Sequence, residues 1–215
     1  MNAIIAGSTG MIGKLILDHC IESEKIDSVT TLVRKATTES AKVNEVVIQN
    51  FEDYSNHENL FQNKDIGFFC IGAYTGQVPD DLFKKITVDY AVAFAKELKR
   101  HNSKATLCLL SGSGADRTEK SRTSFARYKG MAENQISDLG LNFYSFRPAY
   151  IYPVTKRNEP NLMYSISRAL YPVIKLMGKN ASIKSTELAQ AMFKVGLNGA
   201  DKEILENRDI LSLVG

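Results

Sequence analysis

The N-terminal segment constrains the fold of this chain more than any other part of its sequence. A short apolar run over residues 3–6 is followed by three regularly spaced glycines and then at once by a helical pattern. A strand that turns sharply into a helix beside a pyrophosphate needs glycine for the turn, for close approach of the backbone and for helix–strand packing. The helix N-terminus then offers free N–H groups to an anion. The predicted cofactor-binding residues of this turn are Gly7, Ser8, Thr9, Gly10, Met11, Ile12 and Gly13.

The same spacing excludes an ATP-binding P-loop. That motif needs four residues between its first glycine and a Gly-Lys pair, followed by Ser or Thr. Here five residues separate Gly7 from Gly13, and Lys14 is followed by Leu15. No hydroxyl stands where Mg²⁺ would need it, so the turn predicts a dinucleotide site.

Strand and helix patterns alternate along the rest of the chain. Strands are predicted at 2–6, 29–33, 45–48, 66–71, 105–110 and 141–146, with a short one within 203–210. Helices are predicted at 11–22, 80–99, 125–139 and 185–195. This alternation predicts a single α/β domain over residues 1–215, with a Rossmann-like, doubly wound parallel sheet. The proline-rich stretch 147–182 is less regular, and we expect a small cap over the carboxyl ends of the strands, where ligands bind in such sheets.

Composition narrows the function classes without selecting one. The chain has 215 residues, 44% of them hydrophobic, which suits a domain with a sizeable core. A net charge of +3 is too small to predict nucleic-acid binding, and three scattered histidines predict no metal site. No apolar stretch approaches the ~20 residues that span a bilayer. Three widely spaced cysteines, interpreted as buried free thiols, and the lack of a signal-peptide pattern predict a cytoplasmic protein.

The end of the second predicted strand bears on the choice of dinucleotide. NAD-binding versions of this fold place an acidic residue there to hold the adenosine ribose. Here the strand is followed by Arg34 and Lys35, with no carboxylate at that place. An arginine can make two parallel charge-assisted bonds to a 2′-phosphate. We therefore predict NADP in preference to NAD, with Arg34 and Lys35 as cofactor-binding residues; the alternative is that both are solvated loop charges.

Further short motifs carry a resemblance to a known family. Besides the glycine turn, they are Asn50-Phe51, Cys70-Ile71-Gly72-Ala73 and Arg147-Pro148. Over nearly the whole chain these motifs resemble the atypical branch of the short-chain dehydrogenase/reductase superfamily, and within it the Tat-interacting-protein-like and NmrA-like NAD(P)H-binding proteins. The resemblance implies a Rossmann fold and these cofactor-binding residues: Asn50 and Phe51 at the adenine, Cys70, Ile71, Gly72 and Ala73 at the adenosine ribose, and Pro148 near the nicotinamide.

The resemblance also points to a catalytic helix. Reductases of the superfamily use Tyr-x-x-x-Lys and a serine. The spacing of four puts the tyrosine and lysine side chains on one helix face. The lysine lowers the pKa of the tyrosine, so the phenol can exchange a proton with the substrate oxygen. Lys129 takes the lysine position, where it can also hold the nicotinamide ribose, but the residue four before it is Phe125. Tyr128 is adjacent to Lys129, and neighbours on a helix diverge by about 100°. The candidates for the serine are Ser111 and Ser113.

Phe125 leaves three interpretations open. The protein binds NADP(H) without standard catalysis, as a sensor or regulator; or Tyr128 reaches the site as a displaced acid; or substrate or water supplies the proton and hydride transfer still occurs. Two functions follow from these interpretations. One is an NADP(H)-dependent reductase of a small carbonyl or related compound with an altered dyad, and the other is a non-catalytic NADP(H)-binding regulatory protein.

Two other segments carry expectations about loops and partners. The polar stretch 116–124 predicts a mobile loop beside the site. Apolar side chains through 161–177 favour a cover over an apolar pocket or a homodimer contact rather than a membrane surface. The substrate is expected to be a small molecule whose identity the sequence does not give.

Overall fold

The central feature of the fold is a seven-stranded sheet in which every pairing is parallel. The computed structural model describes residues 1–35, 40–74, 76–154 and 180–215. In sequence order the strands of this sheet are β1 (Asn2–Ala6), β2 (Ser28–Val33), β3 (Val43–Val47), β4 (Ile66–Phe69), β5 (Thr106–Leu110), β6 (Asn142–Arg147) and β9 (Ile204–Glu206). Their spatial order is β3-β2-β1-β4-β5-β6-β9. The order reverses between β1 and β4, and ligands of doubly wound sheets bind at such a switch point.

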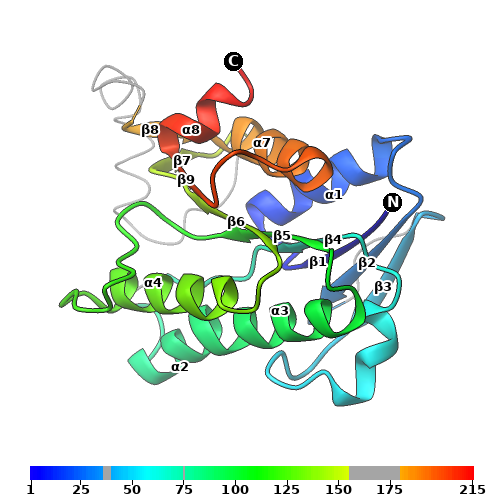
Figure 1. The fold of residues 1–215 in the computed structure, drawn as a ribbon, viewed down its shortest axis with the longest axis horizontal. Coiled ribbons are helices and arrows are strands. Elements are labelled where there is room, and N and C mark those ends of the chain that lie inside the picture. The colour runs from blue at the N-terminus through cyan, green and yellow to red at the C-terminus, as the bar shows by residue number, and fades with distance from the viewer. Residues whose placement is uncertain (36–39, 75, 155–179) are drawn as a thin grey trace.

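Helices cover both faces of the sheet. They are α1 (Met11–Glu22), α2 (Asp80–Lys84), α3 (Tyr90–His101), α4 (Ser124–Ser137), α7 (Ser185–Asn198) and α8 (Asn207–Ser212), with a 3₁₀ segment η1 (Ser55–Phe61) and a π turn η2 (Lys85–Asp89). Figure 1 shows α1 and α7 on one face, and α3 and α4 on the other. Each face has its own apolar core. Central strands are therefore buried on both sides, which explains why β1 and β4 are apolar almost throughout.

The expected alternation of strands and helices is confirmed, and the differences lie at three places. The expected helix 80–99 is continuous from Asp80 to His101 but contains the π turn η2. The expected short strand within 203–210 is confirmed as β9, but the chain then forms α8, which was not expected. A capping box explains this, because the Asp209 carboxylate accepts from the backbone N–H of Glu206 at 3.1 Å and starts a helix there. The segment η1 has no counterpart among the expected elements.

The expected cap over 147–182 lies largely outside the described residues, as does the apolar stretch 161–177. At its two ends β7 (Tyr150–Tyr152) and β8 (Ser182–Lys184) pair in parallel as a separate two-stranded sheet. Within the described part of the chain, no helix combines the length and apolar character needed to cross a membrane.

Candidate functional site

The glycine turn between β1 and α1 is built so that two of its glycines cannot be replaced without moving backbone. Gly7 has φ +91°, and a Cβ there would lie 2.8 Å from the carbonyl carbon of Cys70. A Cβ on Gly13 would overlap the carbonyl oxygen of Gly7. Gly10 is different: its φ of −79° suits any residue, and the nearest atom to a Cβ is the same oxygen at 3.3 Å. Gly7 and Gly13 therefore shape the turn, whereas a Cβ at Gly10 needs a shift of only a few tenths of an ångström.

The turn also leaves polar groups without partners. Gly10 is the N-cap of α1; among residues 1–35, 40–74, 76–154 and 180–215 no side chain caps the helix, and its first turn carries no carboxylate. The Ser8 hydroxyl is buried and, within the described residues, lacks a hydrogen-bond partner. Buried polar groups normally find partners, so unsatisfied donors clustered at a helix N-terminus indicate an anion-binding site. These residues fit the diphosphate of a dinucleotide.

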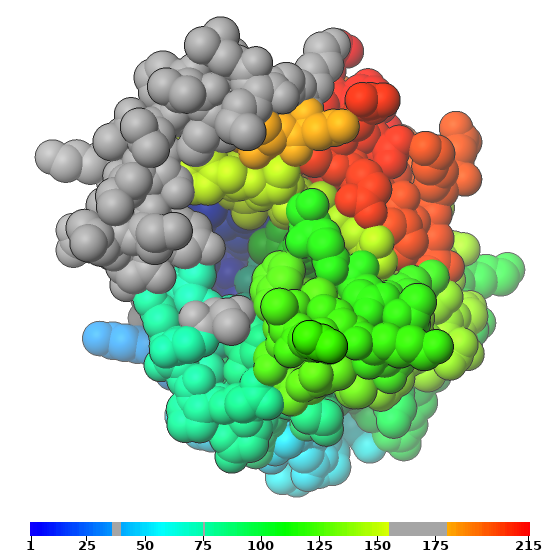
Figure 2. All heavy atoms as spheres, turned by 90° about the vertical axis from the view of Figure 1, so that its left-hand side faces the viewer, coloured from blue at the N-terminus to red at the C-terminus, as the bar shows by residue number. Residues whose placement is uncertain are grey.

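A cleft of about 410 Å³ runs from this turn along the carboxyl ends of the strands. Figure 2 shows the hollow, with N-terminal residues in blue at its floor. It brings together Gly10, Met11, Ile12, Cys70, Ile71, Gly72, Ala73, Ser111, Phe125, Lys129 and Pro148, among others. Burial raises the pKa of the Cys70 thiol to about 12, so this wall of the cleft carries no thiolate at neutral pH.

The residues expected at the adenosine end are divided: Cys70, Ile71, Gly72 and Ala73 line this cleft, whereas Arg34, Lys35, Asn50 and Phe51 lie outside its lining. Arg34 and Lys35 are exposed just after β2, and Asn50 is exposed after β3. Phe51 is only 4% exposed and packs among core rings, 5.7 Å from Tyr90 between ring centres. The Phe51 side chain therefore belongs to the core, and the cationic pair remains available to an anion.

Lys129 and Phe125 occupy one wall of the cleft, one helical turn apart on α4. The Lys129 ammonium donates to the carbonyl oxygen of Leu110 at 3.0 Å. Burial lowers the pKa of Lys129 to about 8, and the nearby negative charge of Glu133 partly opposes that shift. The Phe125 ring lies against Gly112, where it fills the space that a side chain at position 112 would need. An apolar ring thus stands where reductases of the superfamily that the sequence resembles carry a hydroxyl.

Tyr128 and Ser113 are placed away from the cleft. The Tyr128 hydroxyl donates to Asp80 at the start of α2, at 2.6 Å, and its side chain packs near Phe83. Ser113 is exposed, and its backbone N–H donates to the carbonyl of Pro148 at 2.9 Å. Neither residue lines the cleft, so the geometry gives no support to Tyr128 as a displaced acid.

A buried carboxylate beneath the cleft was missed by the sequence analysis. Glu133 is 0% exposed and accepts from the hydroxyls of Ser111 and Ser145 at 2.6 and 2.8 Å. Arg147 donates to both oxygens of the same carboxylate, with its Nε 3.0 Å from Oε1 of Glu133. This pairing raises the pKa of Arg147 and turns its side chain toward Glu133. The spacing of four between Lys129 and Glu133 was the one available signal, because it places both on the same face of α4.

The stretch expected to be a mobile loop is held by its own hydrogen bonds. The Asp116 carboxylate accepts from the backbone N–H groups of Thr118 and Ser121 at 2.9 and 2.8 Å. Arg117 pairs with Glu203 beyond β6, and the Asn134 amide on α4 donates to the Arg117 carbonyl at 2.9 Å. This segment is therefore tied to α4 and to Glu203 rather than being an unattached lid.

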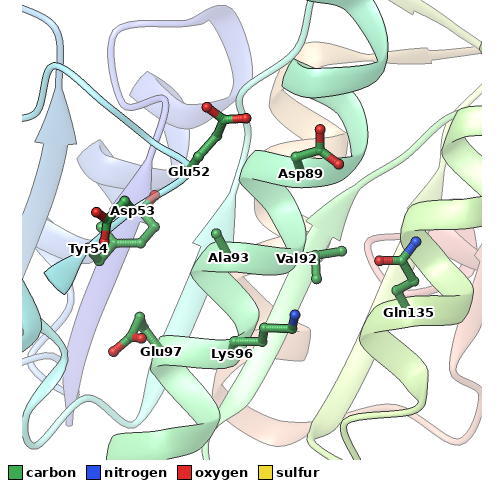
Figure 3. A pocket seen from close by; sticks show the side chains of 9 residues that line it. All are labelled: Glu52, Asp53, Tyr54, Asp89, Val92, Ala93, Lys96, Glu97 and Gln135. Carbon is green, nitrogen blue, oxygen red and sulfur yellow. The ribbon is translucent and has the colours of Figure 1, made fainter.

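A second hollow, of about 300 Å³, lies along the outer side of α3. Figure 3 shows its lining of Glu52, Asp53, Tyr54, Asp89, Val92, Ala93, Lys96, Glu97 and Gln135. Four carboxylates against one lysine would repel a phosphate-bearing ligand. The glycine-turn cleft is therefore the candidate dinucleotide site.

The chain is similar to known proteins at low sequence identity. No family model matches the chain. The chain is 26% identical to protein HTATIP2 of Rattus norvegicus over 220 residues, covering 99% of this chain and 88% of that protein. It is 29% identical to the mitochondrial protein FMP52 of Eremothecium gossypii over 146 residues, covering 66% of this chain and 62% of that protein.

Solved structures share the fold at lower identity. The enzyme WbmH of Bordetella bronchiseptica, in complex with NAD⁺, superposes with a TM-score of 0.72 at 14% identity, covering 95% of this chain and 74% of that one. Gre2 of Candida albicans, in complex with NADPH, gives a TM-score of 0.72 at 11% identity, covering 96% and 77%. These neighbours establish a Rossmann-like architecture, and between them they bind both nicotinamide dinucleotides.

Proposed function

We propose that this chain is an atypical short-chain dehydrogenase/reductase with an NAD(P)-binding Rossmann fold, related to HTATIP2 and FMP52. On that premise, it binds NADP(H) in the glycine-turn cleft and reduces a small carbonyl compound. The observation that carries the proposal is the set of unsatisfied donors at the start of α1, beside the buried Ser8 hydroxyl. The cleft leads from these donors to Lys129, so a dinucleotide with its diphosphate at the turn would extend its nicotinamide toward that lysine.

The proposed preference for NADP rests on Arg34 and Lys35. Both are exposed where β2 ends, beside the switch point of the sheet, and neither forms a salt bridge among the described residues. A guanidinium there can hold a 2′-phosphate through two charge-assisted bonds. Neighbouring structures hold NAD⁺ or NADPH, so for this chain the choice is tested by binding.

Replacing Arg34 by alanine is expected to weaken NADPH about tenfold and to leave NADH nearly unchanged, because only NADPH carries the phosphate that Arg34 would hold. Titration calorimetry of the purified protein with each coenzyme measures both affinities. The matched control is Lys25→Ala, which removes an equal charge from an exposed site before β2, at the opposite end of the strand. Equal losses for NADPH and NADH would reject the 2′-phosphate role, and no binding of either coenzyme would reject the proposed function.

The chemistry of the proposed reductase depends on Lys129 alone, because Phe125 stands at the position of the tyrosine. A bound nicotinamide would supply the hydride. Lys129 is the one cationic side chain among the described residues that line the cleft, and its ammonium can bond the nicotinamide ribose or the substrate oxygen. The ring of Phe125 makes the neighbouring wall apolar. The proton for the product then comes from the substrate or from water rather than from a phenol.

The second candidate is a non-catalytic NADP(H)-binding regulator. It is favoured by the absence of a phenolic hydroxyl from the expected place, since Phe125 fills it and Tyr128 bonds Asp80 instead. In that function the apolar wall and Lys129 hold the coenzyme, and a partner reads its bound or redox state. Oxidation of NADPH in the presence of carbonyl compounds separates the reductase from the regulator.

The lowered pKa of Lys129 predicts a pH-dependent affinity. Below about pH 8 the ammonium is charged and favours the anionic coenzyme; above that pH the charge is lost. NADPH affinity is therefore expected to fall up to about tenfold between pH 7 and pH 9, with a midpoint near pH 8. Calorimetry at several pH values, repeated on Lys129→Met, measures this. An equal fall in the variant would assign the titration to another group.

A further inference from the structure

The hydroxyl of Ser111 has a fixed direction because of the carboxylate beneath it. Glu133 is fully buried, and Arg147, which can only donate, bonds both of its carboxylate oxygens, so each oxygen acts as an acceptor. Every group that bonds Glu133 must donate, including the Ser111 hydroxyl at 2.6 Å. Serine has one hydroxyl proton. That proton is therefore directed to Glu133 and away from the cleft.

Ser111 nevertheless lines the cleft, so its oxygen offers a ligand only lone pairs. Lys129 lines the same wall and offers only donors, and its Nζ is bonded to the carbonyl of Leu110, the residue before Ser111. The wall thus presents an acceptor close to a donor. A carbonyl oxygen suits Lys129 but repels the Ser111 oxygen, whereas a hydroxyl group can accept from Lys129 and donate to Ser111.

We propose that Ser111 is a specificity-determining acceptor that selects an N–H or O–H donor on its ligand, and that Glu133 is the positioning residue that holds it in this state. This inference rests on the proposed function in taking the cleft as the NADP(H) site. The donor has two sources: the carboxamide NH₂ of the nicotinamide, or a hydroxyl of the substrate. In the second case the substrate class is an alcohol or a hydroxylated carbonyl compound.

Two ligand pairs test the inference. The first is NADP⁺ and its 3-acetylpyridine analogue, in which a methyl group replaces the amide NH₂; calorimetry measures both. The second is cyclohexanol and cyclohexanone, measured by backbone amide shifts of isotope-labelled protein. Ser111→Ala is expected to weaken the donor-bearing member of one pair about tenfold, and to leave its acceptor-only partner within about twofold. The pair that responds identifies the source of the donor.

Matched variants separate positioning from structural support. Ser145→Ala removes the other hydroxyl bonded to the same oxygen of Glu133, but Ser145 is outside the cleft lining, so both pairs should be unchanged. Glu133→Gln is expected to erase the discrimination, because a glutamine NH₂ can donate to Ser111 and turn its proton toward the cleft. Glu206→Gln removes the second carboxylate on Arg147, at 3.0 Å, and should preserve the discrimination.

The inference is overturned if Ser111→Ala weakens an acceptor-only ligand as much as its donor-bearing partner, or if neither pair responds. Either result would mean that Ser111 is not a selective acceptor. Failure of the unmodified protein to bind NADP⁺ would instead reject the proposed function. In that event cyclohexanol and cyclohexanone, titrated into the protein alone, still decide the role of Ser111.

Discussion

Alanine at Gly13 is expected to lower the free energy of unfolding by about 3 kcal/mol, whereas alanine at Gly10 is expected to change it by less than about 1 kcal/mol. At Gly13 the added Cβ overlaps the carbonyl oxygen of Gly7, so backbone must move, and the gain of roughly 1 kcal/mol in helix propensity does not offset that cost. At Gly10 the backbone is relaxed and the nearest atom is 3.3 Å away. Denaturant titration measures both changes.

For coenzyme binding we expect the opposite order, with alanine at Gly10 having a larger effect than alanine at Gly13. Gly10 lines the cleft at the N-terminus of α1, where a methyl group would stand in the space of the diphosphate. Gly10→Ala should therefore weaken NADPH by more than about 30-fold while leaving a folded protein. Calorimetry on the folded variant gives the affinity. Unchanged NADPH binding by Gly10→Ala would show that the diphosphate lies elsewhere, and the site assignment would fail.

Replacing Phe125 by tyrosine is expected to raise the rate of carbonyl reduction by about 100-fold or more, which is the usual contribution of a positioned general acid. The new hydroxyl is attached to Cζ, the ring atom nearest to Gly112, so the ring must turn slightly away from that residue to admit the oxygen. It would share the cleft wall with Lys129 four residues later, and so complete the Tyr-x-x-x-Lys pattern. The loss of NADPH absorbance against a panel of small aldehydes and ketones measures the rate.

Three outcomes of that assay have distinct meanings. Turnover by the unmodified protein supports the reductase, and turnover by Phe125→Tyr alone supports the regulator. NADPH binding without turnover by either protein would mean that positions 125 and 129 do not form the catalytic pair. Phe125→Leu is the control for loss of the ring, and Phe125→Tyr combined with Lys129→Met tests whether the gain needs the lysine.

The parts of the fold that the sequence predicts are those set by local patterns. The apolar runs of β1 and β4 and the glycine turn are read within a few residues, and the helix over Met11–Glu22 has the bounds that its pattern predicts. The short helix α8 was missed because its start depends on one side-chain bond, from Asp209 to the backbone of Glu206. A few residues of apolar periodicity do not reveal such a bond.

The candidate site is harder to predict because it joins distant segments. Sequence spacing named Ser111 and Ser113 equally, and only the structure shows that the first faces the cleft while the second is exposed. The Glu133 cluster combines a helix residue with side chains on β6 and on the segment after β5, up to 22 residues away in sequence. No local sequence pattern predicts that these side chains come together, although their contacts determine where the hydroxyl proton of Ser111 points.

The three free cysteines bear on how this protein could respond to oxidants. Burial raises the pKa of both Cys20 and Cys70 to about 12, and that of Cys108 also lies well above its ordinary value. Peroxide attacks thiolates, and these side chains stay protonated in a living cell. A regulator of this construction would therefore be insensitive to peroxide itself, and would follow the metabolic balance between reduced and oxidised coenzyme.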